Sequence, residues 1–144
     1  LTPELVWQDR WMDHANRAEV LEAAILCAEN PADTAARLSR LAGLPLEPDP
    51  AGGFLLRLPG AARAAGPKAP ALETCVRVLT PEALASVLPG VTPPASPCMA
   101  GMVVRTADGA ASARRILAGI PTREAPEGIM VPPEYAAGAA LIFT

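Results

Sequence analysis

A repeated residue pattern constrains the fold of this 144-residue chain more than any other feature. Residues 41–45 read Leu-Ala-Gly-Leu-Pro and residues 117–121 read Leu-Ala-Gly-Ile-Pro, a separation of 76 residues. Residues 53–56, Gly-Phe-Leu-Leu, are matched by Gly-Ile-Met-Val at 128–131, 75 residues later. A helix end, a turn and the next strand therefore return at a nearly constant distance, which indicates an internal duplication.

The first copy begins with an apolar run at 20–28 that predicts a buried strand, followed by a helix over 31–42. Asn30 is placed to cap this helix, a proline occupies its first turn, and a glycine ends it. Two strands are predicted after it, at 54–58 and 72–79. The helical stripe that we expect to face inward consists of Ala35, Leu38, Leu41 and Ala42.

The second copy repeats this order. An apolar strand is predicted at 99–106, then a helix at 109–118 with Asp108 as its cap. A short segment at 122–124 follows, and then strands at 128–131 and 139–143. This second helix is expected to bury Ala113, Ile116 and Leu117.

Each copy reads β-α-β-β-β, a unit too small to bury its own sheet face, so the two copies must share a core. The predicted fold class is therefore α+β, with two paired βαβββ modules. The expected organisation is an N-terminal arm or interdomain connector (1–18), a first module plus a short helix (19–90), a proline-rich linker (91–98) and a second module (99–144). The Ala-, Gly- and Pro-rich stretch 61–71 is expected to be a mobile loop.

Composition excludes several classes of function. Apolar residues make up 51% of the chain, the formal net charge is −3, and no cluster of Lys and Arg occurs, which argues against a nucleic-acid or membrane partner. No apolar run reaches the roughly 20 residues of a membrane span. Three cysteines without a C-x-x-C pair indicate free thiols rather than a disulfide framework. We therefore expect a soluble, cytoplasmic protein.

Paired βαβββ units with glycine-ended helices resemble the vicinal oxygen chelate superfamily, the glyoxalase-like proteins, from Val20 to the C-terminus. The opening Leu-Thr-Pro-Glu-Leu-Val-Trp at 1–7, followed by His14-Ala15-Asn16-Arg17-Ala18, resembles the stretch that joins two glyoxalase-like halves in larger proteins. This chain departs from that pattern with Ala15 in place of Pro and Arg17 in place of Gly. The resemblance implies that the chain is the C-terminal portion of a longer protein.

The resemblance also implies a divalent metal, held by a His on a first strand and a Glu on a last strand around an open cavity. The matching positions fall near Ala23 and Gly101 on the first strands, and near Arg77 and Ile142 on the last strands. None of these residues coordinates a metal, and a site of this kind needs three or four N or O donors. We therefore expect no metal site and no cofactor within this chain.

Candidate ligand-binding residues come from the sheet and the opening arm. Glu73, Cys75 and Arg77 share one face of a predicted strand, and in the resembled fold the face opposite the helices lines the cavity. Arg57 is a second candidate anchor for a polar ligand. His14 has a side chain suited to acid–base work, and Met102 to an apolar pocket wall. For each of these six residues, a plain structural role is the competing interpretation.

Three function classes follow. The first is a metal-free domain that binds a small molecule, with Arg77 or Arg57 as the polar anchor. The second is part of a metal-dependent lyase or dioxygenase whose catalytic residues lie outside this chain or in a partner subunit. The third is a structural or dimerisation module, which would have its cavity filled by side chains. The implied partners are a small-molecule ligand and either a second copy or an N-terminal glyoxalase-like domain.

Overall fold

The computed structural model describes residues 14–59 and 73–144. The predicted arm up to residue 13 and the predicted loop at 61–71 lie outside the described residues. The strands are β1 (Ala18–Cys27), β2 (Glu47–Pro48), β3 (Phe54–Leu58), β4 (Thr74–Leu79), β5 (Cys98–Thr106), β6 (Arg123–Ala125), β7 (Gly128–Val131) and β8 (Ala140–Phe143). The helices are α3 (Pro31–Ala42), α4 (Pro81–Val87), α5 (Ala111–Ile116) and the 3-10 turn η1 (Pro133–Tyr135).

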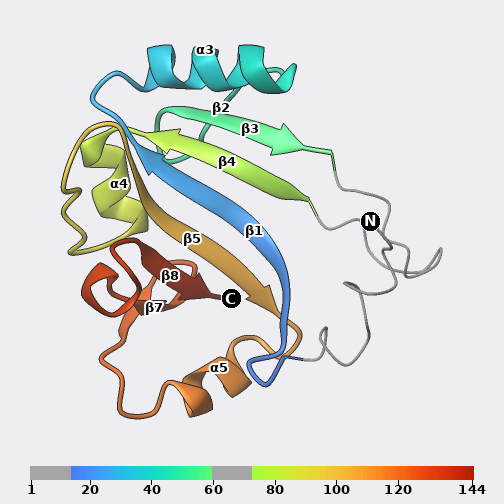
Figure 1. Cartoon of the computed structure of the whole chain (residues 1–144), viewed down its shortest axis with the longest axis vertical. Coiled ribbons are helices and arrows are strands. Elements are labelled where there is room, and N and C mark those ends of the chain that lie inside the picture. The colour runs from blue at the N-terminus through green and yellow to red at the C-terminus, as the bar shows by residue number, and fades with distance from the viewer. Residues whose placement is uncertain (1–13, 60–72) are drawn as a thin grey trace.

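The strands form one eight-stranded sheet in the order β2-β3-β4-β1-β5-β8-β7-β6. β1 runs parallel to β4 and antiparallel to β5, and β5 runs parallel to β8. Each half of the sheet is thus a βαβββ unit, and the two halves meet at the β1–β5 pairing in the middle (Figure 1). This arrangement confirms the predicted α+β fold of two paired modules.

The duplicated glycines have a packing reason. Gly53 directly precedes β3, and Gly128 is the first residue of β7. Both have a positive φ, 104° for Gly53 and 155° for Gly128. A Cβ added to Gly53 would collide with the backbone carbonyl of Val78, and one added to Gly128 would collide with that of Phe143. Only glycine allows the neighbouring strand to approach this closely, so the repeat in the sequence reflects the same backbone contact made twice.

The two faces of the sheet are covered differently. On one face, α3 packs over Leu56 and Val78, while α5 packs over Ile129, Val131 and Phe143. On the other face, α4 covers part of a larger core that draws residues from both modules. The largest fully buried side chains of that core are Ile25, Leu79, Leu84, Leu88, Met130 and Ile142. Helices α3 and α5 thus lie on one side of the sheet, and α4 closes only one end of the other.

Three predicted helix details are corrected. Leu41 is 85% exposed and Ala42 is also exposed. Leu44 and Leu46, from the segment after α3, pack instead against the core cluster that contains Leu56 and Val78. Ile116 is 51% exposed, since α5 ends there and the following Leu117 reaches the core instead.

Asp108 is not the N-cap of α5. That position belongs to Ala110, which has a left-handed φ of 64°. The carboxylate of Asp108 nevertheless accepts a hydrogen bond from the Ser112 N–H at 3.0 Å, and the Thr106 hydroxyl accepts one from the Ala110 N–H at 2.6 Å. The backbone N–H groups at the start of α5 are therefore satisfied by the side chains of Thr106 and Asp108, which both precede the helix.

The strand β2 was not predicted as a separate element, because two residues, one of them a proline, carry no alternating pattern. Among the described residues, no helix is long and apolar enough to cross a membrane.

Candidate functional site: an open cavity on the sheet

The sheet face opposite α3 and α5 carries a cavity of about 710 Å³. Side chains alternate along each strand, so Leu55, Cys75 and Val103 point into it while their neighbours pack against the helices. The wall residues come from β1, β3, β4 and β5, from two turns and from the last residue. They are Glu22, Ala23, Asp49, Pro50, Leu55, Arg57, Cys75, Arg77, Val103, Arg105, Glu127 and Thr144. The cavity is therefore built by both modules.

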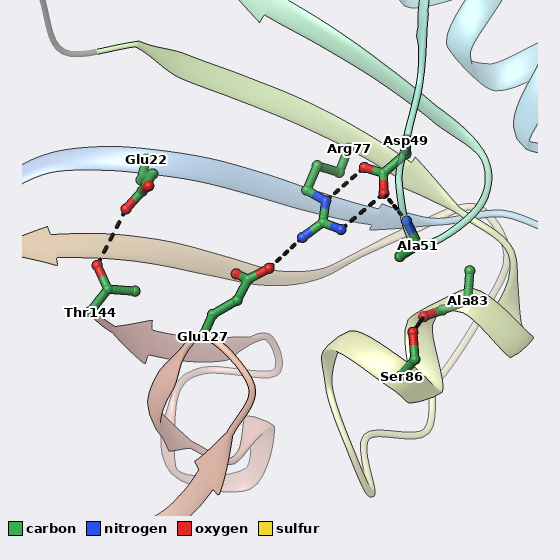
Figure 2. A network of polar contacts seen from close by, with 8 residues as sticks. All are labelled: Glu22, Asp49, Ala51, Arg77, Ala83, Ser86, Glu127 and Thr144. Atoms are coloured by element: carbon green, nitrogen blue, oxygen red, sulfur yellow. Dashed lines mark hydrogen bonds and ion pairs between the residues drawn. The ribbon is translucent and has the colours of Figure 1, made fainter.

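Arg77 is the centre of a polar network in this wall (Figure 2). Its Nε donates to Asp49 Oδ2 at 2.7 Å and its Nη2 donates to Asp49 Oδ1 at 2.9 Å, a two-point contact with one carboxylate. Its Nη1 donates to Glu127 Oε1 at 2.6 Å. Asp49 comes from the turn before β3 and Glu127 from the turn between β6 and β7, so Arg77 joins the two modules across the cavity.

The Asp49 carboxylate is held by its own turn as well. Its side chain is fully buried, and its Oδ1 accepts a hydrogen bond from the Ala51 N–H at 2.8 Å. Burial by itself raises the pKa of this carboxyl, but the hydrogen bonds from Arg77 and Ala51 outweigh it and hold the pKa below its ordinary value. The hydrogen bond to Asp49 likewise raises the pKa of Arg77, against the opposing effect of burial. Both groups are therefore charged at neutral pH.

Arg57 and Arg105 lie on the same cavity face but differ in their partners. Arg57 is half exposed and forms ion pairs with Glu47 at 3.0 Å and Glu73 at 3.3 Å. Arg105 is partly buried and forms no ion pair or side-chain hydrogen bond with the described part of the chain. Glu22 Oε2 accepts a hydrogen bond from the Thr144 hydroxyl at 3.3 Å (Figure 2).

The structure brings three of the six candidate residues together: Arg57, Cys75 and Arg77 line the cavity. Glu73 is exposed and does not line the cavity, but it forms an ion pair with the wall residue Arg57. Met102 and His14 do not line the cavity. Met102 precedes Val103 on β5, so its side chain points to the other face of the sheet. His14 is exposed at the start of the described residues.

Sequence reasoning did not select Glu22, Asp49, Arg105 or Glu127 as ligand-binding residues. A usable signal exists for two of them: Asp49 stands shortly before Gly53, and Glu127 directly before Gly128, so each copy places a carboxylate in the turn before its duplicated glycine. Nothing in the local pattern marks the other two, because their roles depend on which strand lies beside them.

Cys75 is a thiol rather than a thiolate. Burial raises its pKa, and the nearby Arg77 and Arg57 only partly oppose this effect. Because the thiolate is the nucleophilic form, this environment does not activate Cys75 for covalent catalysis.

The donor set does not fit the metal that the resemblance implies. Ala23 and Arg77 line the cavity, but one has no donor atom and the other is a cation. Ile142 is buried in the core, and a Cβ at Gly101 would press against Leu88 and the Ala140 carbonyl. Within 14–59 and 73–144, no three His, Cys, Asp or Glu side chains gather as a metal-ion site.

The fold is similar to that of methylmalonyl-CoA epimerases, which belong to the vicinal oxygen chelate superfamily. The crystal structure of the Mycobacterium tuberculosis enzyme matches with a TM-score of 0.61 and 16% identity, covering 94% of this chain and 93% of that chain. A Streptomyces coelicolor epimerase in complex with 2-nitronate-propionyl-CoA matches with a TM-score of 0.61 and 13% identity, covering 88% of this chain and 96% of that chain. No protein-family model and no curated protein matches the chain.

These similarities confirm the glyoxalase-like fold and, at such low identity, the fold alone. The structural matches extend over nearly the whole of each neighbour, and the expectation that this chain is the C-terminal portion of a longer protein is not confirmed by them.

Proposed function

We propose that the protein binds a small organic molecule in the open cavity without a metal ion, and that an acidic group of this ligand pairs with Arg105. The observation that carries the proposal is a cavity of about 710 Å³ whose wall combines apolar side chains with a cation that no described residue neutralises. Small-molecule sites typically have this size and this mixture of surfaces. The apolar part of the ligand would lie against Ala23, Leu55 and Val103.

Arg77, our expected anchor, is better suited to positioning. Its guanidinium already donates to two carboxylates, and the trio Arg77, Asp49 and Glu127 has a formal charge of −1. An anionic ligand at Arg77 would therefore meet the net negative charge of this trio. Arg105 has no such competitor among the described residues, which favours it as the anchor.

An open cavity also supports a binding function over a purely structural module, for which we expected a cavity filled by side chains. The neighbour with 2-nitronate-propionyl-CoA in its structure suggests the ligands to test first. We therefore propose acyl-CoA thioesters, methylmalonyl-CoA among them, as the first ligand class.

The test is isothermal titration calorimetry of the protein with methylmalonyl-CoA in the presence of EDTA. Replacing Arg105 by Ala should weaken binding about 10-fold or more, since a hydrogen bond to a charged group contributes about 1.5–3 kcal/mol. Arg40→Ala is the matched control, because it removes the same charge from the exposed end of α3. Equal affinities of Arg105→Ala and the unaltered protein would contradict the anchor, and binding that requires an added divalent cation would contradict metal independence.

A second candidate is proton transfer on the bound ligand. Three carboxylates line the same cavity, Glu22 and Glu127 together with Asp49, which Arg77 and the Ala51 N–H hold. Epimerisation of a carbon acid requires groups that remove and return a proton. Incubation with methylmalonyl-CoA in D₂O, followed by mass spectrometry, would show deuterium in the ligand if this activity is present. Glu127→Gln should then abolish the exchange, whereas binding without any exchange would leave only the binding function.

A further inference from the structure

Two cysteines that are far apart in the sequence face each other across the centre of the sheet. Cys27 is the last residue of β1 and Cys98 the first of β5, and the antiparallel register makes them direct partners. β1 ends and β5 begins at the same end of these two central strands, beside α4 (Figure 1). Opposed residues in an antiparallel pair have Cα atoms about 4.5–5.5 Å apart, within the range of about 4.4–6.8 Å that disulfides span.

Both side chains also lie on the same face. Cys27 belongs to the core cluster beneath α4, and Cys98 packs against that cluster from the neighbouring strand. Directly opposed side chains of an antiparallel pair point to one side of the sheet, which the shared cluster bears out. Both cysteines are free thiols, so the pair is present in its reduced form.

We propose that Cys27 and Cys98 form a disulfide when the protein meets a low-molecular-weight disulfide such as oxidised glutathione. The site is distinct from the cavity in which we place the ligand, because neither cysteine lines it. The bond joins the first strand of one module to the first strand of the other.

The exposure of the two thiols sets the order of steps. Cys98 is partly exposed, whereas Cys27 is 1% exposed. Burial raises the pKa of Cys27, and the neighbouring Cys98, Glu82 and Glu29 add to this effect, so Cys27 reacts poorly with an external oxidant. A smaller cavity of about 290 Å³, lined in part by Cys27, Glu29 and Ser96, lies beside the pair.

The reaction is two successive thiol–disulfide exchanges. The Cys98 thiolate attacks one sulfur of oxidised glutathione, which forms a mixed disulfide and releases one glutathione thiolate. The Cys27 thiolate then attacks the Cys98 sulfur of that mixed disulfide and releases the second glutathione. Two protein thiols are oxidised, one glutathione disulfide is reduced to two glutathiones, and the two thiol protons pass to the released thiolates.

The test is incubation of the folded protein with oxidised glutathione, then denaturation, alkylation of the remaining thiols with N-ethylmaleimide and intact-mass measurement. The expected product has lost two hydrogens and carries one alkyl group, and a protease digest should show Cys27 linked to Cys98 and the label on Cys75. Dithiothreitol should restore three alkylated thiols. The thermal unfolding midpoint should rise on oxidation, because the bond closes a long loop of the unfolded chain.

Two variants identify which cysteines form the disulfide. Cys75→Ser should still form the disulfide and leave no thiol to alkylate, while Cys98→Ser should form no internal disulfide. Circular dichroism checks that each variant is folded. Three alkylated thiols after oxidation, a mixed disulfide that persists on Cys98, or a bond to Cys75 would each overturn the proposal.

Discussion

Arg77 shows how much of this site depends on one side chain. It is 12% exposed, and its three donated hydrogen bonds end on carboxylates from both modules. Asp49 has no exposed side-chain surface, so its charge is stabilised by Arg77 and by the turn that it closes. A buried charge of this kind is tolerated only while its partner is present.

Asp49→Asn should therefore lower the free energy of unfolding by about 3 kcal/mol at pH 7, because it leaves the buried Arg77 with one carboxylate instead of two. Urea denaturation followed by circular dichroism measures this change. Asp33→Asn is the control, since Asp33 forms a solvent-exposed pair with Arg37 and its loss should change stability by less than about 1 kcal/mol. Similar losses in both variants would contradict the special role of the buried pair.

The same pair should have a pH signature. The pKa of Asp49 is lowered in the folded protein, so its contribution is complete above the ordinary value of about 3.9 and is lost as the pH falls through the lower, folded value. The stability difference between the unaltered protein and Asp49→Asn should stay constant from pH 7 to about 4 and shrink below it. A difference that shrinks between pH 7 and 5 would point to another titrating group.

At the scale of the element, the turns before β3 and β7 control both the sheet and the site. Gly53 and Gly128 allow the next strand to pass close to a neighbouring backbone carbonyl, and the preceding turns carry Asp49 and Glu127 into the cavity. The duplication therefore repeats both the glycine that permits the close approach and the carboxylate in the turn before it.

Gly53→Ala and Gly128→Ala should each destabilise the protein by more than about 2 kcal/mol, because the new Cβ meets a backbone carbonyl in addition to an unfavourable φ. Gly43→Ala is the matched control: its φ is +67°, but nothing lies within 4 Å of the new Cβ, so only the left-handed backbone penalty of about 1 kcal/mol applies. Thermal and urea unfolding measure all three. Equal effects at Gly43 and Gly53 would show that the close approach is unimportant.

At the scale of the whole molecule, the two modules share one sheet and one core. β1 pairs with β5 along most of its length, and the core beneath α4 contains Ile25 from the first module and Met130 and Ile142 from the second. Neither module can lose this contact and keep its own sheet face buried. The two halves should therefore unfold together.

Ile25→Ala tests this coupling. The side chain is fully buried, so its truncation should lower the unfolding free energy by about 2–5 kcal/mol. Hydrogen exchange should then speed up by the same factor for the protected amides of β3 and of β7, although Ile25 belongs to the first module. Faster exchange in β3 alone would show that the modules unfold independently.

Some features of this protein follow from the sequence by itself, because they depend on neighbouring residues. The Asn30 side chain caps α3 by accepting a hydrogen bond from the Asp33 N–H, and Gly43 ends the helix in a left-handed conformation. The sequence repeat likewise predicts the two βαβββ units. Strand parity also put Cys75 and Arg77 on one face of their strand, and the structure places both in the cavity wall.

Other features were decided only by the tertiary structure, since they join residues that the sequence keeps apart. Arg77 meets Asp49 from 28 positions away and Glu127 from 50, and Cys27 meets Cys98 through strand register. Arg77, which was expected to anchor a ligand, is thereby paired with two carboxylates, while Arg105 lacks a described partner. Local pattern determines which residues form a strand, but sheet order and register determine which charges and thiols are neighbours.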